Sequence, residues 1–259
     1  MDRRANTALV TGAARRIGRA IARALAADGW AVAIHCHAST VDAAAAVAAI
    51  EAEGGRATAL SADLADPAAA GALVGRAAAA LGPVGLVVNN ASLFAPDTVA
   101  TLAPGGLARH MAVNVEAPLL LARALAGALP DGAEGVVVNL LDQKLANPNP
   151  DFLSYTLSKA ALAEATRLLA MALAPRVRVV GVAPGLTLPA PGQDAAQFAA
   201  VHGRTPLGRG AGPDDVAGAV AWLARARAVT GVTVLVDGGQ HLVPSATDVM
   251  FLPVGDKSK

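Results

Sequence analysis

One tyrosine and one lysine are spaced so that they could act together in proton transfer. Tyr155 is the single tyrosine of the chain, and Lys159 follows it four residues later. Residues four positions apart lie on the same face of a helix, so the two side chains would be neighbours. An ammonium group beside a phenol can lower the phenol's pKa from about 10 and let it donate a proton near neutral pH. The spacing therefore predicts a general acid at Tyr155.

A second set of residues is suited to binding phosphate. The sequence TGAARRIG at positions 11–18 follows an apolar run, precedes a helical pattern and contains Gly12 and Gly18. Glycine lets the backbone approach a pyrophosphate closely, and the N-terminus of the following helix attracts its negative charge. The usual motif has another glycine where this chain has Arg16. The pattern predicts a dinucleotide-binding turn of irregular type.

The residues after the second apolar run indicate which dinucleotide would bind. The run ends in IHCHAS at positions 34–39, without Asp or Glu. A site for NAD normally has an acidic residue there to accept hydrogen bonds from the ribose 2′-OH. Arg15, His37 and Ser39 would instead bind a 2′-phosphate, so NADP(H) is the predicted cofactor. Asp63, after the third run, could either cap the next loop or accept a hydrogen bond from the adenine amino group.

These residues stand beside apolar runs that alternate with helical patterns. Apolar runs between helices are typical of buried parallel strands. The alternation predicts an α/β fold, with one doubly wound Rossmann-type domain over residues 1–259, about seven parallel strands and helices on both faces. The predicted strands are Thr7–Thr11, Ala31–Cys36, Ala57–Ser61, Leu86–Asn89, Gly135–Leu140, Val177–Val182 and Val232–Val236, and the predicted helices lie near 16–28, 40–53, 67–81, 105–129, 151–173 and 213–226.

Two segments interrupt this rhythm. Residues 186–213 are rich in proline and glycine, with a short helix expected near Asp194–His202. A loop of this length in an α/β domain is usually functional, so we expect a substrate loop or lid, with a disordered surface insertion as the alternative. The C-terminal tail, residues 240–259, is expected either to cross to a neighbouring subunit or to fray.

Composition excludes several classes of protein. Apolar residues make up 54% and charged residues 16% of the chain, which excludes a disordered polypeptide. A single cysteine, Cys36, argues against a disulfide framework, and no metal site is expected. The net charge of +1, without a dense basic run, argues against nucleic acid as a partner. With neither a secretory signal nor a long apolar run apparent, we expect a cytoplasmic protein without a membrane segment.

Taken together, the motifs resemble the short-chain dehydrogenase/reductase family over nearly the whole chain. The matching elements, in order, are TGAARRIG at 11–18, Asp63, NNAS at 89–92, Asn114, Tyr155 with Lys159, Pro184-Gly185 and Asp237-Gly238-Gly239. The resemblance implies that Tyr155 is the general acid, that Lys159 binds the nicotinamide ribose, and that Asn114 supports a proton-relay water.

One departure indicates a branch of this family. Where the family usually has a serine before the catalytic tyrosine, this chain has Asp142. That change, with Arg16 and the sequence NNASLF at 89–94, resembles the pteridine reductases, which include dihydromonapterin and dihydrofolate reductases of this fold. The resemblance implies that Arg16 contacts cofactor phosphate and pterin, and that Ser92 and Phe94 contact the pterin. Reduction of a ring C=N bond needs a proton at nitrogen, which an Asp–Tyr–Lys relay can deliver.

The site residues expected on this basis fall into three groups. The catalytic group is Asn114, Asp142, Tyr155 and Lys159. The cofactor-binding group adds Gly12, Arg15, Arg16, Ile17, Gly18, His37, Ser39, Asp63, Leu64, Asn90, Ala91, Ser92, Pro184 and Gly185 to Tyr155 and Lys159. The substrate-binding group is Arg16, Ser92, Phe94, Asp142, Tyr155 and Leu186.

Two other functions remain open at this stage. The first is reduction of a ketone or 3-oxoacyl group, with Asp142 in place of the usual serine. The second is a non-catalytic NADP-binding regulator, although intact Tyr155, Lys159 and Asn114 argue against it. In either case, the helices near 105–129 and 151–173 are apolar enough to be buried on more than one side, so a homo-oligomer, dimer or tetramer, is expected.

Overall fold

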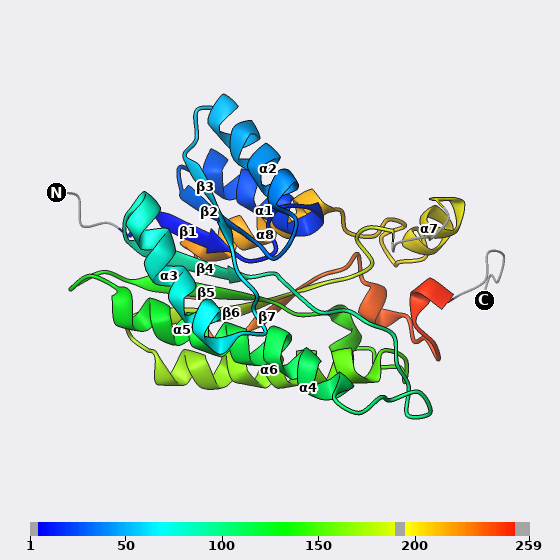
Figure 1. Ribbon diagram of the computed structural model, residues 1–259. Helices are drawn as coiled ribbons and strands as arrows, with labels where there is room; N and C mark the ends of the chain where they lie inside the picture. The colour runs from blue at the N-terminus through cyan, green and yellow to red at the C-terminus, as the bar shows by residue number, and fades with distance from the viewer. Residues whose placement is uncertain (1–4, 190–194, 252–259) are drawn as a thin grey trace.

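The computed structural model describes residues 5–189 and 195–251 and contains one parallel sheet (Figure 1). Its seven strands are ordered β3-β2-β1-β4-β5-β6-β7, and every neighbouring pair runs parallel. The prediction of a doubly wound sheet with helices on both faces is confirmed. The strands are β1 Thr7–Val10, β2 Ala31–Cys36, β3 Ala57–Ser61, β4 Val84–Asn89, β5 Gly135–Leu140, β6 Val177–Pro184 and β7 Thr233–Val236.

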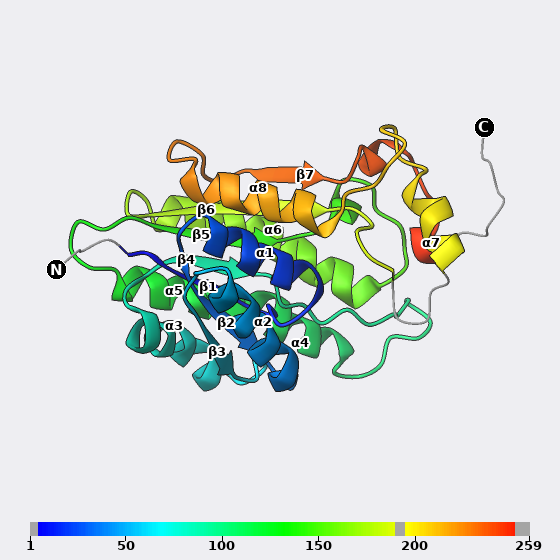
Figure 2. The same ribbon diagram turned by 90° about the horizontal axis from the view of Figure 1, so that it is seen from above.

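Helices cover the sheet on both sides. Figures 1 and 2 show α1, α2 and α8 over one face and α3, α5 and α6 over the other. The longer helices are α1 Arg16–Ala27, α2 Thr40–Ala52, α3 Pro67–Leu81, α5 Ala117–Ala128, α6 Leu153–Ala172 and α8 Pro213–Arg225, and the shorter ones are α4 Gly106–Met111 and α7 Ala195–His202.

Each face of the sheet has its own apolar core. Neighbouring residues of a strand point to opposite faces, and β1 divides accordingly. Val10 packs with Ile21 of α1, whereas Leu9 packs with Leu121 and Leu125 of α5. Both faces are therefore covered, which explains why the strands read as continuous apolar runs rather than alternating ones.

The predicted helix near 105–129 is regular only in part. α4 ends at Met111, a π-helical turn occupies Ala112–Glu116, and α5 follows directly. By length and composition alone, residues 106–128 could cross a membrane. Leu121 and Leu125, however, are fully buried against the sheet, so the position is that of a core helix.

The segment predicted as a substrate loop contains α7, so the expected short helix near residue 202 is confirmed. The start predicted for it, Asp194, lies outside the described residues. α7 and the C-terminal segment lie beyond the carboxyl ends of the strands (Figure 2). As far as Phe251, the tail packs on its own chain, through a Lys144–Asp248 ion pair and a Phe152–Phe251 ring contact. For this part of the tail, the expectation of fraying does not hold, and crossing to a neighbouring subunit stays a prediction.

Candidate active site at the carboxyl ends of the strands

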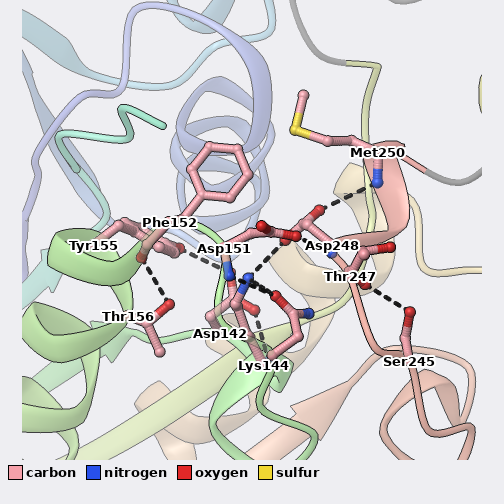
Figure 3. Close-up of polar contacts among 11 residues, drawn as sticks. Asp142, Lys144, Asp151, Phe152, Tyr155, Thr156, Ser245, Thr247, Asp248 and Met250 are labelled. Carbon is pink, nitrogen blue, oxygen red and sulfur yellow. Dashed lines mark hydrogen bonds and ion pairs between the residues drawn. The ribbon is translucent and has the colours of Figure 1, made fainter. Parts of the chain in front are cut away.

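The predicted acid and its partners meet at the carboxyl end of β5. The Tyr155 hydroxyl, in the first turns of α6, donates a hydrogen bond to Asp142 Oδ2 at 2.8 Å. Asp142 follows β5, and its Oδ1 accepts from the Lys144 backbone N–H at 2.8 Å (Figure 3). Lys159, one helical turn after Tyr155, donates from Nζ to the Leu140 carbonyl at 2.6 Å. The structure thus brings Asp142, Tyr155 and Lys159 into one group.

Burial dominates the electrostatics of this group. It raises the pKa of Tyr155 well above its usual value, and the negative charge of Asp142 raises it further. Burial also raises the pKa of Asp142 and lowers that of Lys159 to about 8. Contrary to the expectation, the pKa of Tyr155 is raised, and Lys159 does not offset the effects of burial and of Asp142. The reason is geometric: the phenol hydroxyl faces a carboxylate, while the ammonium group is bonded to a backbone carbonyl.

Asn114 fixes the loop that follows β4. It lies in the π-helical turn, and its Oδ1 accepts from Leu93 N at 2.7 Å. Its Nδ2 donates to the Leu93 carbonyl at 3.0 Å and to Ser158 Oγ at 2.9 Å. π-Turns are frequent at functional sites because they redirect one side chain out of the helical pattern. Here the turn joins the loop that carries Phe94 to helix α6, which is a positioning role.

The glycine turn after β1 is closely packed against the end of β4. Asn90 Nδ2 donates to the Thr11 and Gly12 carbonyls at 2.8 and 3.1 Å. A Cβ atom on Gly18 would lie 2.4 Å from the Gly12 carbonyl oxygen and 2.5 Å from Asn90 Nδ2. Gly12 itself has φ +60°, a conformation that favours glycine. This cradle, which any side chain would fill, fits the pyrophosphate of a dinucleotide at the N-terminus of α1.

A buried histidine supports this turn and was not predicted to do so. His35 Nδ1 accepts from the Gly12 backbone N–H at 3.2 Å, and its Nε2 is 3.1 Å from the Ala62 carbonyl. Since a backbone N–H can only donate, Nε2 must carry the ring proton and donate to Ala62. The ring is 2% exposed, and burial lowers its pKa. The neutral tautomer is therefore part of the folded state.

We expect the stability of the protein to fall as the pH drops below about 6.5, the pKa of an unfolded histidine. The folded pKa of His35 is lower, so in this range the unfolded chain binds the extra proton and unfolding becomes more favourable. This one group contributes at most about 1.4 kcal/mol per pH unit to the slope of the free energy of unfolding against pH. Urea denaturation from pH 7.5 to 5 measures it, with His35→Asn, which does not titrate, and exposed His37→Asn compared with the wild type. An equal acid slope in wild type and His35→Asn would contradict the assignment.

The predicted 2′-phosphate site is partly assembled. Arg15 donates to Ser39 Oγ at 2.5 Å and pairs with Asp42 at 2.8 Å, so its guanidinium lies beside the end of β2. His37 is exposed in the same loop. Sequence reasoning missed Asp42. Its carboxylate holds Arg15 in this place, and a bound phosphate would share the positive charge of the guanidinium with it.

Arg16 takes the place of the missing glycine at a conformational cost. Its φ of +53° is in the left-handed region, where glycine is usual. Its side chain reaches across to donate to the Pro189 carbonyl at 3.0 Å. The irregular motif thus links the cofactor turn to the predicted substrate loop. Leu186, at the start of the same loop, donates from its N–H to Gln240 Oε1 at 2.8 Å.

Phe94 belongs to an aromatic cluster that continues into the C-terminal segment. Its ring stacks on Phe152 at a centroid distance of 4.3 Å and meets Tyr155 edge-on at 4.7 Å. Phe152 in turn stacks on Phe251 at 5.7 Å. Phe94 is 49% exposed, so part of its surface is available to a ligand. The contribution of Phe152 and Phe251 was missed, because neither stands in a recognised motif.

The remaining predicted residues line the same edge of the sheet in different ways. Asp63 caps its own loop by accepting from Ala65 N at 2.9 Å, which fits the first of its two expected roles. Leu64 and Ile17 pack against the core, and Ser92 is exposed. The others stand at strand ends or in the adjoining turns: Ala91 donates from its N–H to Thr11 Oγ1, Pro184 is the last residue of β6, and Gly185 donates to the Val236 carbonyl.

Comparison with known proteins agrees with this geometry. A family model described as short chain dehydrogenase matches residues 6–197. FolM alternative dihydrofolate reductase 1 from Brucella canis, solved with NADP, is 44% identical with a TM-score of 0.89, over 94% of this chain and 97% of that one. Pteridine reductase 1 from Leishmania tarentolae is 31% identical, over 92% of this chain and 97% of its own length. 3beta-Hydroxysteroid dehydrogenase 1 from Eggerthella lenta is 34% identical, over 94% and 96%.

These relatives include proteins named for pterin, folate and steroid substrates, so they agree on the family and differ in the substrate. The family model spans most of the chain, and the Tyr155–Lys159 pair, the glycine turn and the parallel sheet stand where the motifs require them. The chain belongs to the short-chain dehydrogenase/reductase family.

Proposed function

We propose that this protein is an NADPH-dependent reductase of a C=N bond in a pterin, dihydropterin or dihydrofolate. The observation that carries the proposal is the 2.8 Å hydrogen bond between Tyr155 and Asp142, a carboxylate where the family usually has a serine. The relatives named as a dihydrofolate reductase and a pteridine reductase support it. We also propose a cytoplasmic location.

The chain's residues fit the cofactor. The Gly12–Gly18 cradle and the N-terminus of α1 would bind the pyrophosphate, and Arg15 with Ser39 would bind the 2′-phosphate. Lys159, which is buried at the end of β5, is suited to the nicotinamide ribose. When bound, NADPH supplies the hydride that adds to the ring carbon of the substrate.

The proton required at the ring nitrogen comes from this chain. As the C=N π bond accepts a hydride at carbon, its electron pair moves to nitrogen, which takes the proton of the Tyr155 hydroxyl. The raised pKa of Tyr155 keeps this proton on the phenol until the nitrogen becomes basic. Asp142 is placed to accept hydrogen bonds from amino and ring N–H groups of the substrate. The exposed part of the Phe94 ring is available to pack on a flat heterocycle.

The test is NADPH consumption with a matched panel of substrates. We expect oxidation of NADPH with dihydropterins, quinonoid pterins or dihydrofolate, and little with simple ketones or a 3-oxoacyl thioester. Rapid reduction of ketones by a protein that reduces none of the pterins would contradict the proposed substrate class. It would favour the carbonyl reductase alternative, which the steroid dehydrogenase relative represents.

Cofactor choice has its own expected result. Replacing Arg15 with alanine should lower kcat/KM for NADPH far more than kcat/KM for NADH, because the guanidinium would pair with the 2′-phosphate that only NADPH has. Steady-state kcat/KM for both cofactors measures the effect. Arg19→Ala, one turn further along α1 and exposed, is the matched control. Equal losses with NADPH and NADH in Arg15→Ala would contradict the assignment.

We further propose a homo-oligomer, as the helix pattern predicts. On α6, Leu168 and Met171 are 56% and 77% exposed, and Leu119 on α5 is 37% exposed. Such side chains on two long helices are suited to pairing with a second copy. Light scattering that gives a stable particle of 25.6 kDa, the mass of one chain, would contradict this.

A further inference from the structure

Lys144 is a buried cation next to the catalytic group, and the reaction described above does not use it. Its side chain is 4% exposed. Its backbone N–H holds Asp142 Oδ1, and its Nζ donates to Asn149 Oδ1 at 2.5 Å and Asp248 Oδ2 at 2.9 Å (Figure 3). The ammonium group also lies 5.4 Å from the centre of the Phe152 ring. One residue therefore contacts Asp142, the aromatic cluster and the C-terminal segment.

Asp248 is held in turn by the loop that follows Lys144. The Asp248 backbone N–H donates to Asp151 Oδ2 at 2.8 Å, so main chain and side chain are both engaged. Its Oδ1 accepts from Met250 N at 3.2 Å, which shapes the turn that places Phe251 on Phe152. Residues 245–251 are thus seated on the 144–152 loop by one ion pair, one hydrogen bond and one ring contact.

This segment lies on the substrate side of the site. It continues the ring series from Phe94, beside Tyr155, through Phe152 to Phe251. The 3-10 turn Val249–Phe251 is also in contact with α7, which belongs to the predicted substrate loop. These contacts involve neither the glycine turn nor Arg15, where the adenosine half of a dinucleotide would bind.

The ion pair makes docking of the segment and placement of Lys144 interdependent. A buried ammonium group that loses its carboxylate partner is left uncompensated, so the loop must move to expose it to water. Because the Lys144 backbone N–H holds Asp142, that movement would turn Asp142 away from Tyr155. Burial raises the pKa values of Asp142 and Tyr155 most, and the charge of Asp248 raises both further, so the segment also acts on the pair electrostatically.

We propose that Lys144 and Asp248 are positioning residues, whose ion pair docks residues 245–251 as a wall of the substrate site and keeps Asp142 aimed at Tyr155. The assignment deepens the proposed function, on which it rests for the identity of the substrate. The docking itself depends only on this chain's own contacts. The two parts can therefore be tested separately.

The experiment compares Lys144→Met, Asp248→Asn and the double variant Lys144→Met/Asp248→Leu with the wild type. Hydrogen exchange of the peptide that contains residues 245–251, measured without substrate, reports docking. Steady-state kinetics with the best substrate of the panel report positioning. Arg225→Met, which breaks an exposed ion pair with Asp28 on the opposite side of the sheet from α6, is the matched control.

We expect faster exchange in the peptide and at least a tenfold higher substrate KM in both single variants, with kcat lowered most in Asp248→Asn, which leaves the buried ammonium group without its carboxylate. KM for NADPH should change less than twofold. The increase in substrate KM should be smaller in the double variant than in the single variants, because no buried charge is left unpaired. A further variant, Lys144→Arg, keeps the positive charge and should be closer still to the wild type. Arg225→Met should match the wild type.

Unchanged exchange and unchanged substrate KM in both single variants would overturn the proposal. Equal increases in the KM values of substrate and NADPH would overturn it as well, since they would indicate general loss of structure. If the wild type reduces a ketone and no pterin, the proposed substrate class fails. The kinetic test then proceeds with that ketone, and the hydrogen-exchange result stands unaltered.

Discussion

Replacing Tyr155 with phenylalanine is expected to lower kcat at least about 100-fold, the size typical of general acid catalysis. The phenol is the hydroxyl that faces Asp142 at 2.8 Å, and its proton is the one available to a substrate nitrogen. Phenylalanine keeps the ring and therefore its edge contact with Phe94 at 4.7 Å. Binding of NADPH should remain nearly unchanged, because the contacts of Lys159 and the glycine turn are untouched.

Steady-state kinetics and a fluorescence titration with NADPH separate these two effects. Thr156→Val is the control on the same helix: it removes a neighbouring hydroxyl, which donates to the Phe152 carbonyl and not to Asp142. It should keep most of the activity. If Tyr155→Phe retains most of the wild-type kcat, another group supplies the proton and the assignment of Tyr155 as acid is wrong.

The parts of the site that the sequence predicted are those set by short-range rules. Tyr155 and Lys159 share a helix face because their spacing is helical, and Gly12 and Gly18 stand in the turn because a side chain there would collide with backbone. The order of apolar runs predicted the sheet for the same reason: in a parallel sheet covered on both faces, the residues of the inner strands are nearly all buried. These properties are local, so a linear sequence carries them.

The parts that it did not predict depend on contacts between distant residues. Lys144 and Asp248 are 104 positions apart, and nothing near either residue indicates a partner. In the π-turn at Ala112–Glu116, Asn114 accepts a hydrogen bond from the loop after β4. Helical periodicity alone cannot reveal this contact. The error over the pKa of Tyr155 has the same origin, because the helical spacing placed Lys159 correctly but could not show that its ammonium group bonds the Leu140 carbonyl.

Replacing Asp142 with serine is expected to cost about 100-fold or more in pterin or dihydrofolate reduction, and to raise activity toward ketones. A carboxylate can accept from the amino and ring N–H groups of a pterin, whereas a serine hydroxyl carries no charge for this edge. Toward a ketone the preference reverses, because a carboxylate next to a developing alkoxide repels it in a cleft with little water. Asp142 is therefore matched to a substrate that presents N–H donors.

Asp142→Asn separates charge from hydrogen bonding at this position. Its side-chain oxygen can still accept from the Lys144 N–H or the Tyr155 hydroxyl, but it carries no negative charge. We expect Asp142→Asn to lose pterin reduction, because it lacks the charge that attracts the N–H groups of a pterin. Like Asp142→Ser it should gain activity toward ketones, because its amide N–H can donate to an alkoxide while its oxygen keeps one of these contacts. The measurement is kcat/KM for one dihydropterin and one ketone in all three proteins. If Asp142→Ser reduces pterins as well as the wild type does, the carboxylate has no part in choosing the substrate, and its bond to Tyr155 is structural.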